Sequence, residues 1–317
     1  MIKCAVVGLG RIGWELSNDP KREKPTTHVE CILSTEETEL VAGCDIDSDK
    51  VEKFQKRFKI NTYKNIDEML NKEKIDILHI ATPTKTHKEI LIKAIDKNIP
   101  VIICEKPLTS NLKEAKKVLK KIKKSSSKLI VNYERRYSKD YKYVKEIIES
   151  KKYGELLSIN GKLYIKTGSI KKALWHDATH LIDIIMFLTG ENKIKLKNVL
   201  NNNKVLNLFF KSDTKSITIE ISNLSDYLLF EVDLLFEKGR ILVGNGIFKE
   251  YASEDSPFYT GFKSLIEKEI EFNKTEYFIG MFRDAIKSFK EKNYIPLSNI
   301  YTSYENIKIM TKIIKYL

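Results

Sequence analysis

The residues most able to do chemistry begin directly after the first apolar run of the chain, residues 2–7. That run leads into the glycine-rich turn Gly8-Leu9-Gly10-Arg11-Ile12-Gly13. A strand followed by G-x-G-x-x-G and a helix start is typical of dinucleotide binding, because the glycines allow a tight turn, close approach of a pyrophosphate and close helix packing. The phosphates then lie at the positive end of a helix. We therefore predict a cofactor-binding turn that contains Gly8, Gly10, Arg11, Ile12 and Gly13.

A carboxylate ends the second strand-like run, residues 39–44, at the place where this fold binds the adenosine ribose. It is Asp45, and it lies further from the glycines than the usual spacing of about 20 residues. Residues 17–28, with Pro20 and Pro25, account for the excess as an inserted loop that breaks the first helix. No arginine stands beside Asp45, and Asp47 follows it, so NAD is favoured over NADP. The alternative is that Asp45 caps the next helix.

Two further segments follow later apolar runs, where open α/β sheets bind ligands. They are residues 81–87 and 104–107. The second contains a Glu-Lys-Pro triplet, whose lysine could also be an ordinary solvated lysine in a turn. The candidate cofactor-binding residues in the two segments are Thr82, Pro83, His87, Glu105 and Lys106.

The elements that must position these motifs differ between the two halves of the chain. The first half predicts strands at 2–7, 39–44, 75–81, 101–104 and 128–132, with helices from 13 onward and over 48–58, 66–71, 87–98 and 112–124. This alternation predicts a parallel sheet covered by helices on both faces.

The second half predicts several strands in quick succession. Helices are expected at 141–150, 177–189, 275–290 and about 298–317, and strands at 156–166, 195–200, 205–211, 216–222, 228–236 and 240–243. Short connections between strands favour an antiparallel or mixed sheet, and therefore an α+β domain. We predict a first domain over 1–130 and a second, for substrate binding and oligomerisation, over 131–317, with the C-terminal helices packing back on the body of the protein.

Together these motifs resemble the glucose–fructose oxidoreductase, inositol dehydrogenase and MocA-type family (Gfo/Idh/MocA). The resemblance covers nearly the whole chain, including residues 132–137, 230–233 and 238–240, and the Glu-Lys-Pro triplet is its most specific signal. It implies a doubly wound Rossmann domain followed by an α+β domain with an open, mostly antiparallel sheet. It also implies a nicotinamide-dependent oxidoreductase that acts on a sugar or cyclitol.

The resemblance assigns the reaction to two side chains. Lys106 matches the family's active-site lysine, whose ammonium polarises a carbonyl or stabilises an alkoxide as hydride leaves. His180 matches a histidine carried on a helix, and imidazole suits a proton acceptor because it titrates near neutral pH. Asp183 lies one turn further along and is expected to orient His180.

The segment around His180 departs from the commoner family pattern. Many members carry an aspartate four residues before the histidine, where this chain has His176. Asp177 lies three residues before His180. Two roles are therefore possible for Asp177: a catalytic role and a role as the N-cap of the helix. A metal site built from His176, His180 and Asp183 is the less favoured alternative. The remaining expected substrate contacts are Arg136, Tyr164, Lys166 and His176.

Bulk composition limits the classes of function. With 317 residues the chain has room for two domains. Its net charge of +13 comes mostly from lysine spread along the whole chain without a recognition motif, so nucleic-acid binding is not expected, although an anionic substrate would be attracted. No apolar run is long enough to cross a bilayer, no signal peptide is evident, and the four cysteines show no C-x-x-C spacing. We expect a cytoplasmic protein that binds no membrane.

The sequence thus predicts an NAD-dependent dehydrogenase for a sugar, an amino-sugar derivative or a cyclitol. Two alternatives stay open: a family relative that uses NAD to hydrolyse glycosides, and a regulator or scaffold that binds the nucleotide without chemistry. The open sheet needs a cover, which predicts a homodimer or homotetramer.

Overall fold

The computed structural model describes residues 1–190, 194–212, 215–272 and 274–317. The chain divides into two compact units, each of which is described by itself. Unit 1 contains Met1–Tyr137 and Glu276–Ile307, and unit 2 contains Ser138–Thr275 and Lys308–Leu317. The sequence predicts a second domain over 131–317 whose C-terminal helices pack back on the body of the protein, and here the late segment Glu276–Ile307 groups with unit 1.

Unit 1 is built on a six-stranded sheet in which every pair of neighbouring strands is parallel. The strand order is β3-β2-β1-β4-β5-β6, so the chain reverses direction of winding between β1 and β4. The strands are β1 (Ile2–Val7), β2 (Thr38–Cys44), β3 (Asn61–Tyr63), β4 (Ile77–Ile80), β5 (Val101–Cys104) and β6 (Lys128–Val131). This is the expected Rossmann sheet, and only the short β3 was not predicted.

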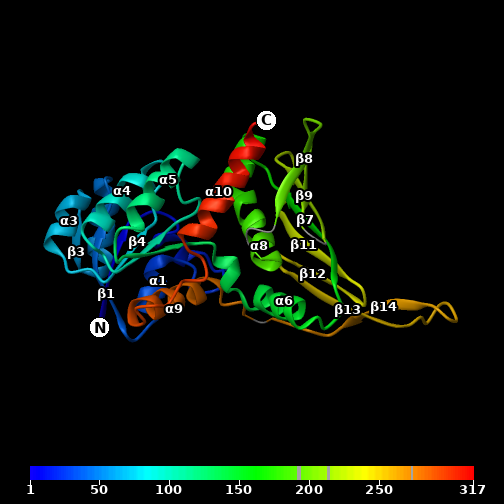
Figure 1. Ribbon diagram of the computed structural model, residues 1–317. Helices are drawn as coiled ribbons and strands as arrows, with labels where there is room; N and C mark the ends of the chain where they lie inside the picture. Colours follow the sequence, from blue (N-terminus) through cyan, green and yellow to red (C-terminus); the bar gives the residue numbers. More distant parts are fainter. Residues whose placement is uncertain (191–193, 213–214, 273) are drawn as a thin grey trace. The chain divides into compact units, whose positions relative to one another are not determined.

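Helices cover this sheet on both faces, as Figure 1 shows. They are α1 (His28–Leu33), α2 (Ser48–Phe58), α3 (Ile66–Lys72), α4 (Thr84–Asp96), α5 (Leu112–Ile122), α9 (Tyr277–Lys290) and the first part of α10 (Ile300–Ile314). Although α9 comes late in the chain, its Phe278, Met281 and Phe282 join the same apolar core as Ile103 and Ile130. Burial of these side chains fixes the late segment to unit 1.

The prediction of a helix from Gly13 onward is wrong. Residues 11–14 form turns, a short 3₁₀ helix follows at Glu15–Asn18, and regular α-helix begins only at His28. The N–H of His28 donates to the carbonyl of Ile12 over 3.2 Å, a bond that Leu16 would make in an uninterrupted helix. The inserted loop therefore leaves the helix after its first turn and returns to the same axis at α1.

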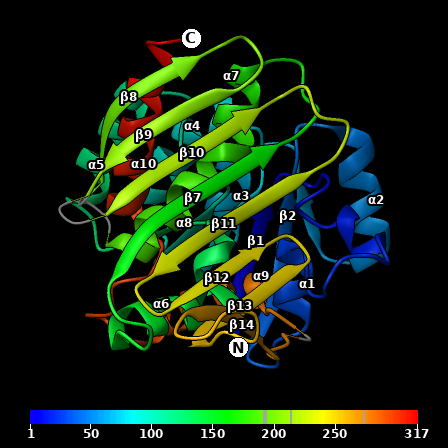
Figure 2. The same ribbon diagram turned by 90° about the vertical axis from the view of Figure 1, so that its right-hand side faces the viewer.

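Unit 2 contains an eight-stranded mixed sheet in the order β14-β13-β12-β11-β7-β10-β9-β8, which Figure 2 presents face-on. Among the described strands of this sheet, only β7 and β10 pair in parallel. The strands are β7 (Leu156–Tyr164), β8 (Lys195–Asn201), β9 (Leu206–Lys211), β10 (Ser216–Ser222), β11 (Leu229–Phe236), β12 (Gly239–Gly244), β13 (Ile247–Asp255) and β14 (Lys263–Lys268). The predicted α+β domain is confirmed, with β13 and β14 as two strands that were not predicted.

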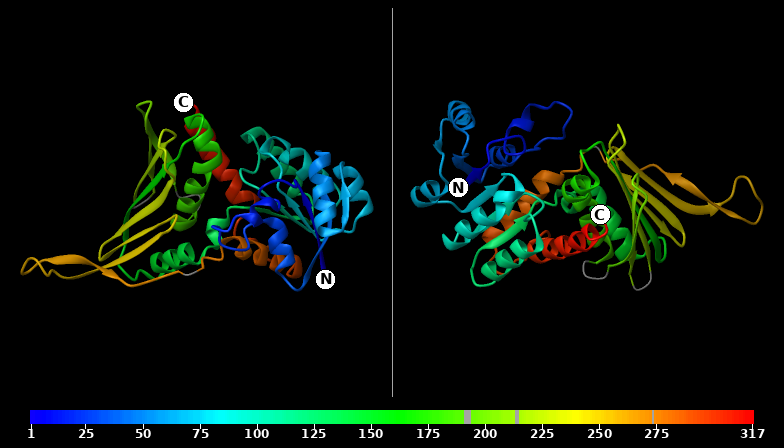
Figure 3. Two further views of the ribbon diagram at one scale, coloured as in Figure 1. Left: turned by 180° about the vertical axis from the view of Figure 1, so that it is seen from behind. Right: turned by 90° about the horizontal axis from the view of Figure 1, so that it is seen from above.

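One face of this sheet is packed and the other is open. The helices α6 (Lys139–Ser150), α7 (Ile170–Ala173) and α8 (Thr179–Thr189) come before most of the strands, and Figure 3 shows the green helical segment on one side of the sheet. A side chain at Gly161 of β7 would meet Leu181 and Ile185 of α8, so that face of β7 packs tightly on the helix. From Ser158 to Tyr164 of β7, side chains at even-numbered positions point to the opposite, open face.

The four cysteines are Cys4, Cys31, Cys44 and Cys104, and all are buried and free. Burial raises the pKa of the Cys44 thiol to about 12, so this thiol stays protonated at neutral pH. Across the described ranges, no helix combines the length and the apolar character that crossing a membrane requires.

Candidate active site

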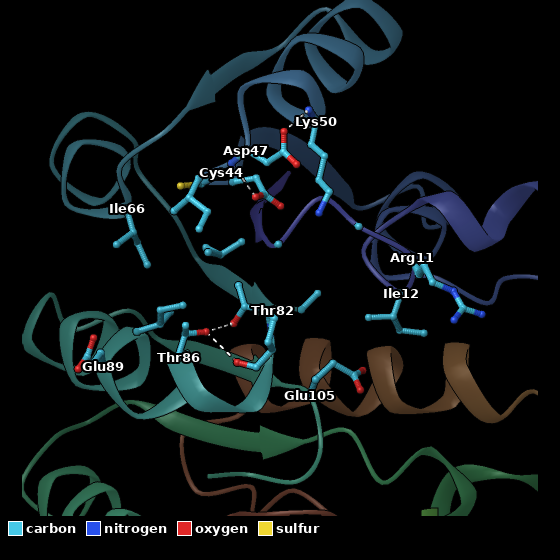
Figure 4. A pocket seen from close by; sticks show the side chains of 18 of the residues that line it. Arg11, Ile12, Cys44, Asp47, Lys50, Ile66, Thr82, Thr86, Glu89 and Glu105 are labelled. Carbon is cyan, nitrogen blue, oxygen red and sulfur yellow. Dashed lines mark hydrogen bonds between the residues drawn. The ribbon is translucent and has the colours of Figure 1, made fainter. Parts of the chain in front are cut away.

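A cavity of about 780 Å³ opens in unit 1 at the carboxyl ends of the parallel strands. Its walls come from the turn after β1, the end of β2, the segment after β4 and the end of β5, which are far apart in sequence. Figure 4 shows Asp47 and Lys50 on one side, Thr86 and Glu89 on another, and Glu105 near Ile12 and Arg11. The predicted residues that line it are Gly8, Gly10, Arg11, Ile12, Asp45, Thr82, Pro83, Glu105 and Lys106.

The glycine turn has the shape that a pyrophosphate needs. Gly8 has a φ of +97°, and a Cβ there would lie 2.6 Å from the backbone of Ala81. A Cβ at Gly10 would meet only the Nζ of Lys50, at 3.7 Å, so it would project into open space beside the cavity. Gly13 cannot carry a side chain, because its Cβ would lie 2.2 Å from the Gly8 carbonyl oxygen. The bare backbone at Gly10 therefore fits close approach of a phosphate group.

Asp45 is held at the cavity edge by backbone hydrogen bonds. Its Oδ2 accepts from the N–H of Leu9 over 2.8 Å, and its Oδ1 accepts from the N–H of Asp47 over 3.0 Å. Helix α2 is capped by Asp47, whose carboxylate accepts from the N–H groups of Asp49 and Lys50. The alternative of Asp45 as the helix cap is thus wrong, and its carboxylate lines the cavity instead.

The segment after β4 presents Thr82 and Pro83 to the cavity, while His87 lies behind them. His87 is fully buried, with its ring nitrogens 2.8 Å from the Thr82 carbonyl oxygen and 3.1 Å from the Pro107 carbonyl oxygen. Burial lowers the pKa of His87, while its contacts with the two carbonyl oxygens act in the opposite direction. His87 braces two cavity loops against each other and is not among the residues that line the cavity.

Glu105 and Lys106 both reach the cavity from the end of β5, and the Lys106–Pro107 peptide bond is cis. The Oε1 of Glu105 accepts from Asn132 Nδ2 over 2.5 Å and lies 3.1 Å from His28 Nε2. Burial opposes ionisation, but these hydrogen bonds outweigh it and hold the pKa of Glu105 below its usual range. The triplet therefore presents an ionised carboxylate beside the ammonium of Lys106.

Sequence reasoning missed several residues of this site. Lys50, Lys64 and Lys93 also line the cavity and add positive charge to its walls. His28 lies in the interior beside Glu105, although it comes from the inserted loop and shares no spacing with the other motifs. These lysines and this histidine lie in no recognisable motif, and the chain contains many other lysines. Their positions at the cavity or beside Glu105 therefore could not be predicted before the fold was known.

In unit 2, the segment around His180 lies inside a helix rather than at its start. Helix α7 begins after Ser169, whose side chain caps it, and leads through a π-helical turn at Leu174–Ala178 into α8. Asp177 lies within that turn, so it is not the N-cap of the helix. π-turns inside helices are frequent at functional sites, because the extra residue redirects neighbouring side chains.

The π-turn sets how the neighbouring polar side chains are exposed. His176 is exposed, Asp177 and His180 are half-buried, and Asp183 is buried one turn after His180 on α8. The part of the chain that the structure describes contains no group of three His, Cys, Asp or Glu side chains arranged to hold a metal ion.

The other expected substrate contacts are Tyr164 and Lys166 in unit 2 and Arg136 in unit 1. Tyr164 points to the open face of the unit 2 sheet, opposite α8, where its hydroxyl donates to Glu220 over 3.0 Å. Lys166 is exposed beyond the end of β7. Arg136 is fully buried in unit 1, where its guanidinium donates to the Leu297 carbonyl oxygen over 3.3 Å. The structure brings neither Tyr164 nor Lys166 to the face of the sheet that carries His180.

Comparison with known proteins agrees with the sequence motifs. Residues 2–133 match the family model described as "Oxidoreductase family, NAD-binding Rossmann fold" (GFO_IDH_MocA). An inositol 2-dehydrogenase of Salmonella paratyphi B is 24% identical over 199 residues, which cover 60% of this chain and 55% of that protein. The chain therefore spans about half the length of the curated relatives that it matches.

Solved structures share the fold over the whole chain. A dehydrogenase (MviM) from Clostridium difficile superimposes with a TM-score of 0.80 at 20% identity and covers 100% of this chain and 99% of its own. The WlbA dehydrogenase from Bordetella pertussis, crystallised with NADH and UDP-GlcNAcA, has a TM-score of 0.78 at 16% identity, with 99% and 94% covered. At these identities the likeness shows the fold of both units.

Proposed function

We propose that the chain, whose residues 2–133 match the Gfo/Idh/MocA oxidoreductase family model, is an NAD-dependent dehydrogenase of that family acting on CH–OH groups. The observation that carries the proposal is the unit 1 cavity, where the bare glycine turn, Asp45 and the Glu105–Lys106 pair come together. Its substrate is a sugar, an amino-sugar derivative or a cyclitol, in keeping with the names of its relatives. The buried free thiols suit a reducing compartment, and we place the protein in the cytoplasm.

Each side chain has a role in this proposal. The cofactor, when bound, supplies or accepts the hydride. The glycine turn receives the pyrophosphate, and Asp45 accepts hydrogen bonds from the adenosine ribose hydroxyls. Lys106 stabilises negative charge that develops on the reacting oxygen, and His180 accepts the proton of the substrate hydroxyl. Asp183 orients His180, and Asp177 assists as a second polar group of the π-turn.

The choice of NAD over NADP rests on the acidic end of the cavity. A 2′-phosphate would meet the carboxylates of Asp45 and Asp47, which both line that end. Lys50 and Lys64 offset part of this repulsion, so the preference depends on the closer contact with Asp45. The positive charge from lysines in the wall also suits the phosphates that both cofactors share.

Substitution Asp45→Ala is expected to weaken NAD binding about tenfold and to reduce the preference over NADP, because one charge-assisted hydrogen bond to the ribose is lost. Calorimetric titration with both cofactors measures this. Asp49→Ala is the matched control, because Asp49 is an exposed aspartate in the first turn of the neighbouring helix α2 and does not line the cavity. Equal losses in the two variants would contradict the role of Asp45.

A panel of stereochemically diverse sugars, cyclitols and nucleotide sugars, followed by NADH absorbance with NAD and NADP in parallel, tests the activity. Net NADH formation with at least one polyol is expected. Release of a glycoside without net NADH would instead favour the hydrolytic alternative, and NAD binding with no turnover of any kind would favour a regulator or scaffold.

We also propose that a second copy of the chain covers the open face of the unit 2 sheet. That face carries partly exposed apolar side chains, including Phe209 and Leu235, beside the paired Arg240 and Asp233. Light scattering is expected to give the mass of a dimer or tetramer, and Leu235→Glu is expected to shift it toward the monomer because it places a charge in the apolar contact. A monomeric wild-type protein would refute the proposal.

A further inference from the structure

A buried chain of polar side chains ends at Glu105 on the cavity wall. His79 on β4 places its Nδ1 3.0 Å from the Nδ1 of His28, and the Nε2 of His28 lies 3.1 Å from Glu105 Oε1. Asn132 donates to the same oxygen. Both histidines have 0% exposure, with Phe278 packed on the His28 ring and Phe282 on the His79 ring. Only Glu105 of this network lines the cavity.

The hydrogen bonds of this buried network determine which ring nitrogen of each histidine carries a proton. Burial lowers the pKa of His79 well below its usual range, so its ring carries one proton. Among the described residues, His79 Nε2 has no hydrogen-bond partner. A buried N–H without an acceptor is rarer than a buried lone pair without a donor, so the proton lies on Nδ1 and is donated to His28. His28 then carries its own proton on Nε2 and donates it to Glu105.

This arrangement leaves the network of His79, His28 and Glu105 with one negative charge, on Glu105, which lies beside the ammonium of Lys106 at one end of the cavity. Asp45 marks the adenosine end and the glycine turn holds the pyrophosphate between them, so Glu105 lies at the end that receives the nicotinamide. The nicotinamide ring is cationic in NAD⁺ and neutral in NADH. A fixed carboxylate beside it favours the oxidised form.

Building on the proposed function, we propose that His28 is a positioning residue that keeps Glu105 ionised at the nicotinamide end and thereby favours binding of NAD⁺ over NADH. His79 fixes the tautomer of His28, and Asn132 supplies the second donor. The inserted loop matters for this network because it returns the chain to the helix axis at His28. The His28 ring therefore lies within hydrogen-bond distance of Glu105.

Other charged groups also act on Glu105. The ammonium of Lys106 lowers its pKa, and His87 and Glu134 are close enough to interact with its charge. Burial alone would raise the pKa of Glu105, and the interaction with His28 is the largest of those that lower it, followed by the Asn132 donor and the charge of Lys106. Loss of the His28 donor is therefore expected to make Glu105 protonate near neutral pH.

The test compares the dissociation constants of NAD⁺ and NADH by calorimetry between about pH 6 and pH 9. In the wild-type protein the ratio of the NAD⁺ and NADH dissociation constants is expected not to change with pH. In His28→Leu, NAD⁺ binding is expected to weaken on the order of fivefold to tenfold at the acidic end and to recover as the pH rises and Glu105 ionises, with NADH binding little changed. His28→Gln keeps an N–H donor near the position of Nε2 and is expected to restore the flat ratio.

Cys31→Ala is the matched control, because Cys31 is a buried α1 residue outside the network, and its ratio is expected to match the wild type. A flat ratio in His28→Leu would overturn the inference. Should that variant not fold, ¹⁵N spectra of histidine in the wild-type protein decide: an imidazolium His28 at pH 7 would overturn the inference, and a neutral His28 protonated at Nε2 supports it. Failure of the wild-type protein to bind either cofactor would instead refute the proposed function.

Discussion

Substitution Lys106→Met is expected to lower kcat about 10³-fold while NAD binding changes little. In the proposed function the ammonium of Lys106 stabilises charge that develops on the reacting oxygen, whereas the pyrophosphate and ribose contacts are assigned to other residues. Methionine keeps most of the side-chain volume, so the cavity wall is preserved. Steady-state kinetics with the substrate identified in the panel, together with calorimetric titration of NAD, measure the two effects separately.

Lys85→Met is the matched control, because Lys85 is an exposed lysine of α4 that does not line the cavity. It is expected to leave kcat unchanged. If Lys106→Met retained wild-type turnover, Lys106 would not be the catalytic lysine, and the assignment from the Glu-Lys-Pro triplet would be lost.

His180→Asn is expected to reduce kcat on the order of 10²- to 10⁴-fold, the usual contribution of a general base. In the wild-type protein, oxidation of the substrate is expected to slow as the pH falls and the base becomes protonated. This fall in rate at low pH, the acidic limb of the pH profile, is expected to disappear in His180→Asn, because asparagine does not titrate in place of the histidine. Initial rates measured across the pH range check this.

Asp183→Asn is the informative companion to His180→Asn. The amide keeps the size of the buried side chain but loses its charge, so a smaller loss of kcat and a shifted acidic limb are expected. An unchanged pH profile in His180→Asn would show that another group accepts the proton.

Most of the residues that line the unit 1 cavity at its glycine turn and strand ends were predictable because their signals are local. A strand followed by three glycines requires a bare backbone, and the structure shows the close approaches at Gly8 and Gly13 that make it necessary. Asp45 follows β2 directly, and the Glu-Lys-Pro triplet follows β5, so their places at the sheet edge followed once the strands were recognised.

What could not be predicted depends on contacts between distant segments. The pair His28 and His79 is 51 residues apart and meets only because the inserted loop rejoins the helix axis. Similarly, α9 packs into the core of unit 1 through its apolar side chains. The periodicity of these side chains predicts that one face of the helix is buried, but it does not predict which element that face packs against. The sequence pattern of a strand predicts that its side chains alternate between the two faces of the sheet, but it does not predict which face packs on a helix. Tyr164 is therefore an expected substrate contact in the sequence, although in the structure it faces away from α8.

The segment around Asp177 shows a limit of a different kind. An aspartate before an apolar helical pattern is typical of an N-cap, yet here the helix had already begun at Ile170 and passes through a π-turn. A π-turn adds one residue to the helical period and leaves no distinct signature in composition. Its presence beside His180 became visible only in the backbone.

The central claim is that the unit 1 cavity binds NAD through the bare backbone at Gly10. Calorimetric titration of NAD into the wild-type protein and Gly10→Val tests it directly, with Gly168→Val as the control, because an added Cβ at Gly168 would have no heavy atom within 4 Å. We predict one NAD per chain in the wild type and the control, and loss of binding in Gly10→Val with an unchanged melting temperature. No binding to the wild-type protein, or equal binding by Gly10→Val, would contradict the account.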